Sequence, residues 1–295
     1  MSSCSVAEKS QRALGALFVV ATPIGNLEDI TLRAIRTLKE ADLIACEDTR
    51  HTQGLLERYA IRTNLVSYHE HNEVMRAPEL ILLMEQGSRI ALVSDAGMPA
   101  VSDPGYRLVR LAIRHGIAVT PVPGPSALVA SLAASGLPIE HFRFLGFLPS
   151  KALPRQKALR SLAEAAETLV FYEAPHRVIE MIEDAIRILG DRPVVIAREV
   201  TKVHEEFLRG SASEVLGTLN GKSVKGEITV LIGPADPSIL KTASAAALKS
   251  VLRQVERLMR EQGVIEREAL KTLARSSGIS KSELYRRLQA EKSLK

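Results

Sequence analysis

The sequence is poor in cysteine, which restricts both its covalent and its metal chemistry. Cys4 and Cys46 are its two cysteines, and they are far apart and lack CxxC spacing. Such a pair predicts neither a disulfide framework nor a structural zinc site. The sequence therefore favours a protein of the reducing cytoplasm that binds no metal.

The sequence also lacks an apolar run long enough to span a bilayer. The apolar segment 13–21 follows Lys9 and Arg12, as the core of a signal peptide would. It passes at once into Thr22-Pro23-Ile24-Gly25-Asn26, which suits the end of a parallel strand and does not suit a cleavage site. We therefore predict a buried first strand and no association with a membrane.

What the sequence does contain is apolar residues in bulk and a charge excess at one end. Its 295 residues are 46% hydrophobic and 25% charged, enough to bury a sizeable core in two or three domains. Residues 241–295 hold 13 Lys and Arg against 6 Asp and Glu, whereas the first 240 residues hold 26 against 28. This asymmetry favours a nucleic acid or another polyanion as partner of the tail, and a solvated helical face is the alternative.

The stretch 89–127 predicts the core of a ligand site. An apolar run at 90–93 ends in the glycine-rich loop 94–99, and a helical pattern leads to a second strand at 117–122 and a second loop at 123–126. In an open α/β sheet, ligands bind outside the carboxyl ends of the strands. We expect the two loops to frame one small-molecule site, although glycine and proline also mark ordinary surface turns.

The remaining chain predicts two α/β domains and a helical tail. A mobile segment 1–15 precedes a first domain over 16–135, with further strands at 17–21, 43–46 and 64–68. A second domain over 136–235 has strands at 143–147, 168–172, 194–197 and 228–232, with charged loops at 173–177 and 198–206. Residues 241–295 have helix-turn-helix spacing: Gly278 makes the turn, and Ile279, Leu284 and Leu288 pack inward.

Eight segments carry a resemblance to a known family, in the order VATPIGNLEDIT, CEDTRHT, VSDAGMPAVSDPG, PVPGPSA, FLGFLPSK, FYEAPHR, REVTKVHEE and KGEIT. Together they resemble the tetrapyrrole-methylase superfamily, in particular its members that methylate ribose in 16S rRNA. The resemblance implies two α/β domains with S-adenosylmethionine in a cleft between them, and a homodimer. It also implies methyl transfer to the 2′-hydroxyl of a cytidine in the decoding region of the small ribosomal subunit.

The resemblance assigns cofactor-binding residues motif by motif. They are Pro23, Asp95, Ala96, Gly97, Met98, Pro99, Ser126, Ala127, Tyr172, Glu173 and Thr229. Met98 stands where the family usually has threonine. The glycine-rich turns agree with this assignment, because they let backbone groups approach an adenosyl moiety, and the sequence has no phosphate-binding lysine motif.

Polar residues near the same loops are candidates for catalysis and for RNA contact. The candidate catalytic residues are Glu173, His176, Arg177, Glu199 and Lys202. A ribose hydroxyl could be deprotonated or oriented by Glu173, His176 or Glu199, with Glu47, Asp95 and Glu205 as further possibilities, while Arg177 and Lys202 could hold phosphates. The RNA phosphates could be held by Arg50, Lys151, Arg155, Arg198, Arg286 and Arg287. Sequence reasoning does not choose one base, and it leaves open whether the basic start of the helix near Lys151 faces RNA or water.

Two other functions remain open from the sequence. One is methylation of a corrinoid precursor, which would not need a basic tail. The other is a DNA-binding regulator with a ligand-sensing α/β body, which would bind duplex DNA sequence-specifically through Arg286 and Arg287.

Overall fold

The computed structural model describes residues 14–221, 223–235, 252, 255–256, 258–260, 263–277 and 280–292. These residues form two compact units. The first unit holds both sheets and runs to Pro234 except for residues 163–166, which belong with the residues from Ala235 onward. The mixed α/β class predicted from the sequence is confirmed.

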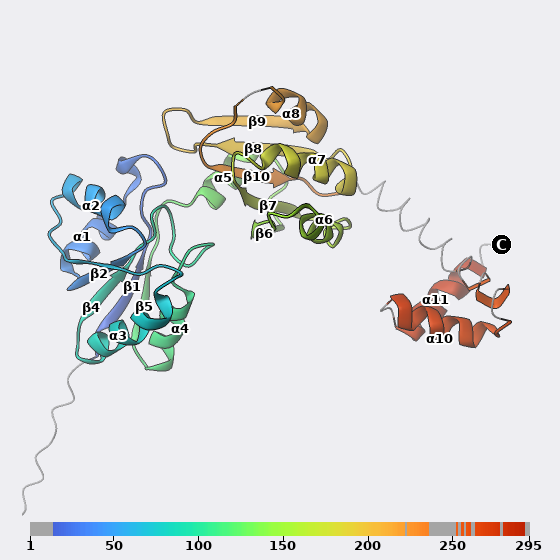
Figure 1. Ribbon diagram of the computed structural model, residues 1–295, viewed down its shortest axis with the longest axis horizontal. Coiled ribbons are helices and arrows are strands. Elements are labelled where there is room, and N and C mark those ends of the chain that lie inside the picture. Colours follow the sequence, from blue (N-terminus) through green and yellow to red (C-terminus); the bar gives the residue numbers. More distant parts are fainter. Residues whose placement is uncertain are drawn as a thin grey trace, which may run out of the picture. The chain divides into compact units, whose positions relative to one another are not determined.

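The first sheet is entirely parallel, with strand order β3-β2-β4-β1-β5. Figure 1 labels β1, β2, β4 and β5 of this sheet. Its strands are β1 (Ala16–Val20), β2 (Leu43–Cys46), β3 (Leu65–Ser67), β4 (Arg89–Leu92) and β5 (Ala118–Val122). The helical elements between them are η1 (Leu27–Asp29), α1 (Leu32–Glu40), α2 (Thr49–Arg58), α3 (Glu73–Glu85) and α4 (Tyr106–Arg114).

Alternation along these strands builds two cores, one on each face of the sheet. Leu17 and Ile90 point to the face covered by α3 and α4, where they pack with Leu80 and Leu108. Their neighbours point to the other face, which α1 and α2 cover. Because both faces of a parallel sheet are buried, its strands read as continuous apolar runs, which is why the sequence located all five.

The second sheet is mixed, with strand order β6-β7-β10-β8-β9. Its strands are β6 (Phe142–Phe147), β7 (Thr168–Glu173), β8 (Pro193–Arg198), β9 (Glu206–Ser211) and β10 (Ile228–Ile232). β6 and β7 are parallel, while β10 runs antiparallel to both β7 and β8. The carboxyl ends of β6, β7 and β8 therefore meet the amino end of β10 at one edge of this sheet.

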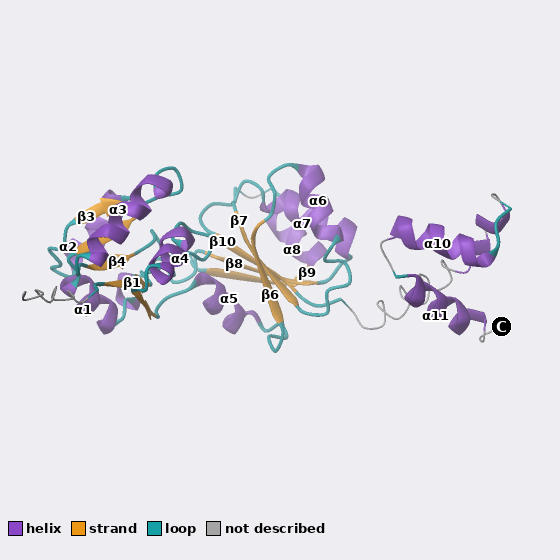
Figure 2. Ribbon diagram, turned by 90° about the horizontal axis from the view of Figure 1, so that it is seen from below, coloured by secondary structure: helices purple, strands orange, loops and turns teal. Residues whose placement is uncertain are grey.

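Four helices accompany the second sheet: α5 (Ala127–Ser135), α6 (Ala152–Arg160), α7 (Val178–Leu189) and α8 (Ala212–Leu219). α5 lies on one face, with α6, α7 and α8 on the other (Figure 2). The sequence pattern predicted that α5 belongs to the first domain. Its Leu132 packs against Val170, Val195 and Leu231 of the second sheet. Judged by these contacts, α5 belongs with the second sheet, and the first domain ends before this helix.

The tail contains α10 (Glu266–Ser277) and α11 (Lys281–Lys292). Leu270, Leu273, Leu284 and Leu288 form its core together with Val255. The predicted inward positions Leu284 and Leu288 are thus buried. The predicted turn residues Gly278 and Ile279 lie outside the described residues.

Candidate functional site

The loops after β1 and β4 open side by side at the carboxyl edge of the first sheet. β1 and β4 are neighbours, but the chain leaves β1 toward β2 over one face and leaves β4 toward β5 over the other. This reversal is a topological switch point, where open α/β sheets bind ligands. A pair of backbone hydrogen bonds joins the loops, because the N–H groups of Thr22 and Gly97 each donate to the other residue's carbonyl, at 2.9 and 3.1 Å.

The loop after β4 is held in an unusual backbone conformation. Gly97 has φ +82°, and the non-glycine residues Ala100 and Ser102 have φ +67° and +63°. Gly105 follows at φ +140°, where a Cβ would lie 2.9 Å from the Leu92 side chain. Left-handed non-glycine residues cost on the order of 1–3 kcal/mol each and persist where surrounding packing fixes them. The loop is therefore a shaped element, and its strain is concentrated beside the ligand edge.

Aromatic side chains of the second sheet face the same region. The Tyr172 ring, at the end of β7, packs against Phe144 and Phe147 of β6, with ring centroids 4.9 and 5.8 Å apart. Gly146 has φ +63° beside a bulge in β6, and a Cβ there would lie 3.1 Å from the Ser102 hydroxyl. This close approach ties the β6 end to the strained loop of the first sheet.

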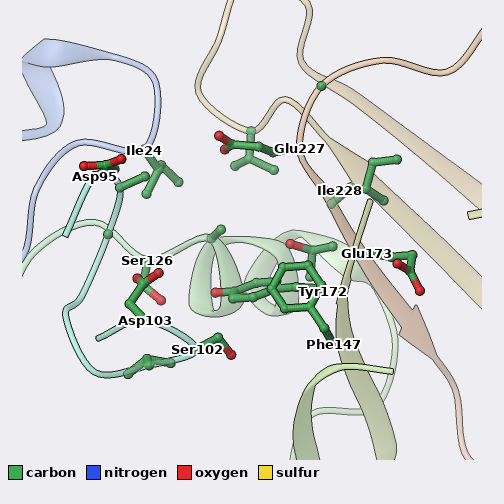
Figure 3. Close-up of a pocket in the computed structure, with 18 of the residues that line it drawn as sticks. Ile24, Asp95, Ser102, Asp103, Ser126, Phe147, Tyr172, Glu173, Glu227 and Ile228 are labelled. Atoms are coloured by element: carbon green, nitrogen blue, oxygen red, sulfur yellow. The ribbon is translucent and has the colours of Figure 1, made fainter. Parts of the chain in front are cut away.

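The loops from both sheets enclose a cavity with a volume of about 350 Å³, within the range of small-molecule pockets (Figure 3). In Figure 3 the Tyr172 hydroxyl is directed toward the side of the cavity that holds Asp103 and Ser126. The lining comprises Ile24, Asp95, Ala96, Gly97, Met98, Val101, Ser102, Asp103, Ser126, Ala127, Phe147, Tyr172, Glu173, Ala174, Pro175, Ala197, Val200, Gly226, Glu227, Ile228 and Thr229.

Most of the residues assigned to the cofactor line this cavity. They are Asp95, Ala96, Gly97, Met98, Ser126, Ala127, Tyr172, Glu173 and Thr229. Pro23 and Pro99 are not among the lining residues, although each adjoins one that is. Met98 also packs against the core between the first sheet and α3.

Carboxylates on the first-sheet side of the cavity form no ion pair with a cation in the described part of the chain. No salt bridge within residues 14–235, as far as these are described, involves Asp95 or Asp103. Burial raises the pKa of Asp103 to about 6, and the charges of Glu47, Asp95 and Glu227 act in the same direction against a hydrogen bond from Ser94. Burial and the charge of Asp95 likewise raise the pKa of Glu47. This side of the cavity is electronegative.

Carboxylates that follow β7 are bound to cations instead. Glu173 is 3% exposed, accepts a hydrogen bond from the Ala174 N–H at 2.8 Å and forms an ion pair with Arg177 at 3.2 Å. Burial raises the pKa of Glu173, opposed by the Ala174 N–H and by Arg177. Arg177 also donates to the Leu148 carbonyl at 2.7 Å, so the pair fixes the 173–177 loop to the end of β6.

The loop after β8 contains a second paired group. The Lys202 ammonium lies 2.9 Å from Glu199 and 3.3 Å from Glu227, and the Glu227 N–H donates to Glu199 at 2.9 Å. Burial alone would raise the pKa of Glu199, but the Glu227 N–H and Lys202 outweigh it and the pKa is lowered. A Cβ at Gly226 would collide with the Glu199 carboxyl, and one at Gly25 with Lys202. Glu199 and Lys202 brace the loops around the cavity.

The predicted catalytic residues therefore divide by environment. Glu173 lines the cavity and is tied to Arg177, while Glu199 and Lys202 are tied to each other and are not lining residues. His176 is exposed and is likewise not a lining residue.

The predicted RNA contacts lie in different surroundings. The Arg50 side chain is 90% exposed and forms an ion pair with Asp48, and Lys151 is exposed at the start of α6. Arg198 is mostly covered and bonded to Glu206 at 3.0 Å. In the tail, the Arg286 side chain is 79% exposed, whereas the Arg287 side chain lies outside the described residues.

Arg155 requires a correction, because its side chain is only 3% exposed. It donates to Asp184 of α7 at 2.7 Å and to Glu180 at 3.2 Å. Counting basic residues at the start of α6 could not show this, since Arg155 points inward on a helix whose neighbours Lys151 and Leu153 are exposed. Its charge stabilises the α6–α7 pair and is not available to RNA.

Sequence reasoning also missed part of the cavity. Asp103, Ser102 and Val101 line it although no role was assigned to them, and so do Phe147 and Glu227. All five lie in or beside the quoted motifs VSDAGMPAVSDPG, FLGFLPSK and KGEIT. The motifs located these segments, but which side chains reach the cavity depends on the left-handed turns and on the bulge in β6.

Two α/β sheets whose ligand edges share one cavity are the architecture of a class of S-adenosylmethionine-dependent methyltransferases. The family model of the tetrapyrrole (corrin/porphyrin) methylases matches residues 16–216. The chain belongs to this family, whose methyl donor is S-adenosylmethionine.

Within this family, the chain is similar to proteins named as methyltransferases of ribosomal RNA. The chain is 48% identical over 271 residues to ribosomal RNA small subunit methyltransferase I of Halalkalibacterium halodurans, covering 92% of this chain and 93% of the relative. It is 42% identical to the protein of the same name from Synechocystis, covering 92% and 96%.

Solved structures resemble this fold at low sequence identity. Cobalt precorrin-4 methyltransferase, a cobalamin biosynthetic enzyme, matches with a TM-score of 0.59 at 18% identity, over 75% of this chain and 96% of that one. Uroporphyrin III C-methyltransferase from Thermus thermophilus matches with a TM-score of 0.53 at 22% identity, over 74% and 97%. No helix among the described residues is long and apolar enough to cross a membrane.

The cavity fits this methyl donor chemically. Its lining combines apolar side chains such as Ile24, Val101 and Ile228 with the carboxylates of Asp95 and Asp103. An adenosyl group matches the apolar part, and the sulfonium and ammonium charges match the carboxylates.

Proposed function

We propose that this chain transfers a methyl group from S-adenosylmethionine to the 2′-hydroxyl of a cytidine ribose in 16S rRNA, in the decoding region of the small ribosomal subunit. The observation that carries the proposal is the cavity at the joined loops after β1 and β4, in a chain 48% identical to a small-subunit rRNA methyltransferase. When bound, S-adenosylmethionine supplies an activated methyl group.

The residues around the cavity have two tasks in this reaction. The loop 95–98, with Ser126 and Ala127 opposite, would hold the donor, and Tyr172 and Thr229 would close the second-sheet side. The ribose oxygen must be held in line with the methyl group, and its proton must be removed. The strained loop after β4 suits both tasks, because a preorganised backbone needs little rearrangement when substrates bind.

Neither alternative function receives the same support. Cobalt precorrin-4 methyltransferase and uroporphyrin III C-methyltransferase match this fold at 18% and 22% identity, against 41% to 49% for relatives named as rRNA methyltransferases. A DNA-binding regulator would have no need for the methylase match over residues 16–216.

The tail is proposed to hold the ribosomal substrate. Residues 241–295 carry the basic excess of the chain. α10 and α11 pack around a shared apolar core, and the Arg286 side chain lies on their exposed surface. Arg286 and Arg287, with Arg50 and Lys151, would then contact phosphates, which position RNA without reading its sequence. We also propose that the protein is a homodimer and lies in the cytoplasm. Analytical ultracentrifugation tests the dimer, which should have about twice the monomer mass of 32.2 kDa.

The function is tested by mass mapping of 16S rRNA from cells with and without the gene. The proposal expects one cytidine to lose its 2′-O-methyl group without the gene and to regain it when the gene is restored. An unchanged pattern of 2′-O-methylation would contradict it.

The role of the tail is tested by deleting residues 241–295. Affinity for S-adenosylmethionine should persist, because all the cavity residues precede Pro234. Binding to the small subunit should weaken and lose part of its salt dependence as phosphate contacts disappear. Arg286→Glu should have the same effect more mildly. Methylation of subunits by the folded truncated chain at an undiminished kcat/KM would exclude this role.

A further inference from the structure

Methylation of a hydroxyl needs a group that takes up the proton, and the structure narrows the choice. Such a group must reach the cavity, keep an oxygen free of cations, and be held in place. Four carboxylates line the cavity: Asp95, Asp103, Glu173 and Glu227.

Three of these four carboxylates are engaged elsewhere or lie open to water. Glu173 is tied to Arg177 and to the Ala174 N–H. Glu227 pairs with Lys202, and its side chain is 68% exposed. Asp95 keeps an oxygen free of cations, but its carboxylate accepts a hydrogen bond from the Asp48 N–H at 3.1 Å and thereby joins the loops after β2 and β4. Asp103 also accepts a hydrogen bond, from the Ser94 hydroxyl, but this bond stays within the loop after β4 and links it to no other loop. Asp103 is therefore the candidate.

Asp103 is held by the conformation of its own loop. It follows Ser102, which has φ +63° and lies against Gly146 of β6, and it precedes Pro104, whose carbonyl accepts the Ala100 N–H at 3.3 Å. The loop is therefore closed on itself and clamped by the second sheet. Figure 3 shows the Asp103 carboxyl in the cavity, on the side toward which the Tyr172 hydroxyl is directed.

The groups that face Asp103 are anionic or neutral. Among the described residues they are Glu47 after β2, Asp95 after β4 and Glu227 before β10, together with the Ser94 hydroxyl and the Tyr172 phenol. Burial and the charges of Glu47, Asp95 and Glu227 raise the pKa of Asp103 to about 6, against a hydrogen bond from Ser94 that lowers it. A carboxyl with this pKa is a stronger base than an ordinary aspartate and is still ionised at neutral pH.

We propose that Asp103 is the catalytic residue that accepts the proton of the attacking ribose hydroxyl. In this step the 2′-oxygen forms a bond to the methyl carbon, and the carbon–sulfur bond breaks with its electron pair on sulfur. The hydroxyl proton passes to a carboxylate oxygen of Asp103, which releases it to water afterwards. The inference rests on the proposed function, since it concerns the same cavity and substrate.

The first test measures single-turnover methylation of unmethylated small subunits by the full chain. Asp103→Asn should bind S-adenosylmethionine within about threefold of wild type, yet methylate about 100- to 10,000-fold more slowly. Asp103→Glu should keep part of the activity. Asp42→Asn is the matched control, because exposed Asp42 lies at the amino end of β2, away from the cavity, and Asn can still accept the Arg89 N–H.

The pH profile distinguishes a proton acceptor from a structural residue. Because the bound donor lowers the pKa of Asp103 from about 6 in the free chain, the wild-type rate should fall on an acidic limb with a midpoint below pH 6, and Asp103→Asn should lose this limb. A rate for Asp103→Asn within about threefold of wild type, or a loss explained by weaker donor binding, would overturn the proposal. If Asp103→Asn fails to fold, the pH–rate profile of Asp103→Glu is measured in its place. An acidic limb with the same midpoint as that of wild type would then overturn the role of Asp103.

A second test needs no methyl transfer. A cation in the cavity lowers the pKa of Asp103, so binding of S-adenosylmethionine at pH 6 should release up to roughly half a proton. Calorimetry in two buffers of different ionisation enthalpy measures this release. S-adenosylhomocysteine, which has no sulfonium charge, should release less, and Asp103→Asn should release almost none. Equal release from wild type and Asp103→Asn would overturn the proposal.

These outcomes separate the inference from the proposed function. Wild-type enzyme that fails to methylate small subunits contradicts the function. Active wild type together with an equally active Asp103→Asn contradicts only the role of Asp103.

Discussion

The two sides of the cavity contain the same kind of residue in opposite electrostatic settings. On the first-sheet side, Asp95 and Asp103 have no cationic partner among the described residues. On the second-sheet side, the lining residue Glu173 is paired with Arg177, and Glu199, which adjoins the lining residue Val200, is paired with Lys202. The difference shows that a carboxylate in a ligand cleft can take part in the reaction or can hold loops in place. A carboxylate bound to a cation does the second, and one without a cation is free to do the first.

The paired side should be the more sensitive to loss of a charge. Arg177→Met leaves the Glu173 carboxylate buried, with a side chain 0% exposed, and should lower the free energy of unfolding by about 3–5 kcal/mol. The double variant Glu173→Gln with Arg177→Met should recover much of that loss. Urea denaturation of the three proteins measures the coupling.

Asp95→Asn is the matched change on the unpaired side and should cost less than about 1 kcal/mol, because Asn can still accept the Asp48 N–H. If Arg177→Met and Asp95→Asn destabilise the fold equally, the contrast between the two sides is wrong.

The glycine-rich loop should respond through ligand affinity more than through stability. Gly97 and Gly116 both have left-handed φ, +82° and +70°, but Gly97 lines the cavity, whereas a Cβ at Gly116 would have no contact within 4 Å among the described residues. Valine at either position introduces similar backbone strain. Gly97→Val should weaken S-adenosylmethionine binding at least about 100-fold, equivalent to about 2.7 kcal/mol. Gly116→Val should leave it unchanged, and calorimetry on both folded proteins would expose a failure of this distinction.

A smaller effect than the loss of donor affinity is a pH-dependent gain in stability. The pKa of Asp103 is raised to about 6 in the folded chain, so the folded state binds a proton more tightly than the unfolded state does. Ionisation of Asp103 therefore destabilises the fold as the pH rises from about 4 through 6. Asp103→Asn removes this penalty and should be about 1–2 kcal/mol more stable than wild type at about pH 8, allowing for partial exposure.

At about pH 4 the two proteins should be equally stable. Thermal unfolding at both pH values measures the gain, and a variant less stable than wild type at pH 8 would count against an unpaired Asp103.

The sequence predicted the fold well wherever the pattern is local. Each strand of the first sheet is a buried apolar run that ends in a glycine or polar loop, so periodicity alone located it. β9 was missed because Glu206, Arg209 and Ser211 break any apolar alternation, and the strand forms through antiparallel pairing with β8. The residue pattern of one segment does not show which other segment it will pair with.

The site residues also differ in how far the sequence could predict them. Gly97 and Ser126 were located because they sit in loops that follow predicted strands. Asp103 was not, because its environment comes from Glu47 and Glu227, which are distant in sequence. Arg155 was misassigned because its partner Asp184 lies 29 residues away on another helix.

The contrast between the two sides is tested most directly by titrating the carboxyl carbons of Asp103 and Glu199 by nuclear magnetic resonance, with assignments from Asp103→Asn and Glu199→Gln. The account predicts that Asp103 titrates with a midpoint near pH 6 and Glu199 below its ordinary value of 4.5. An Asp103 midpoint at or below the ordinary aspartate value of 3.8 would contradict it.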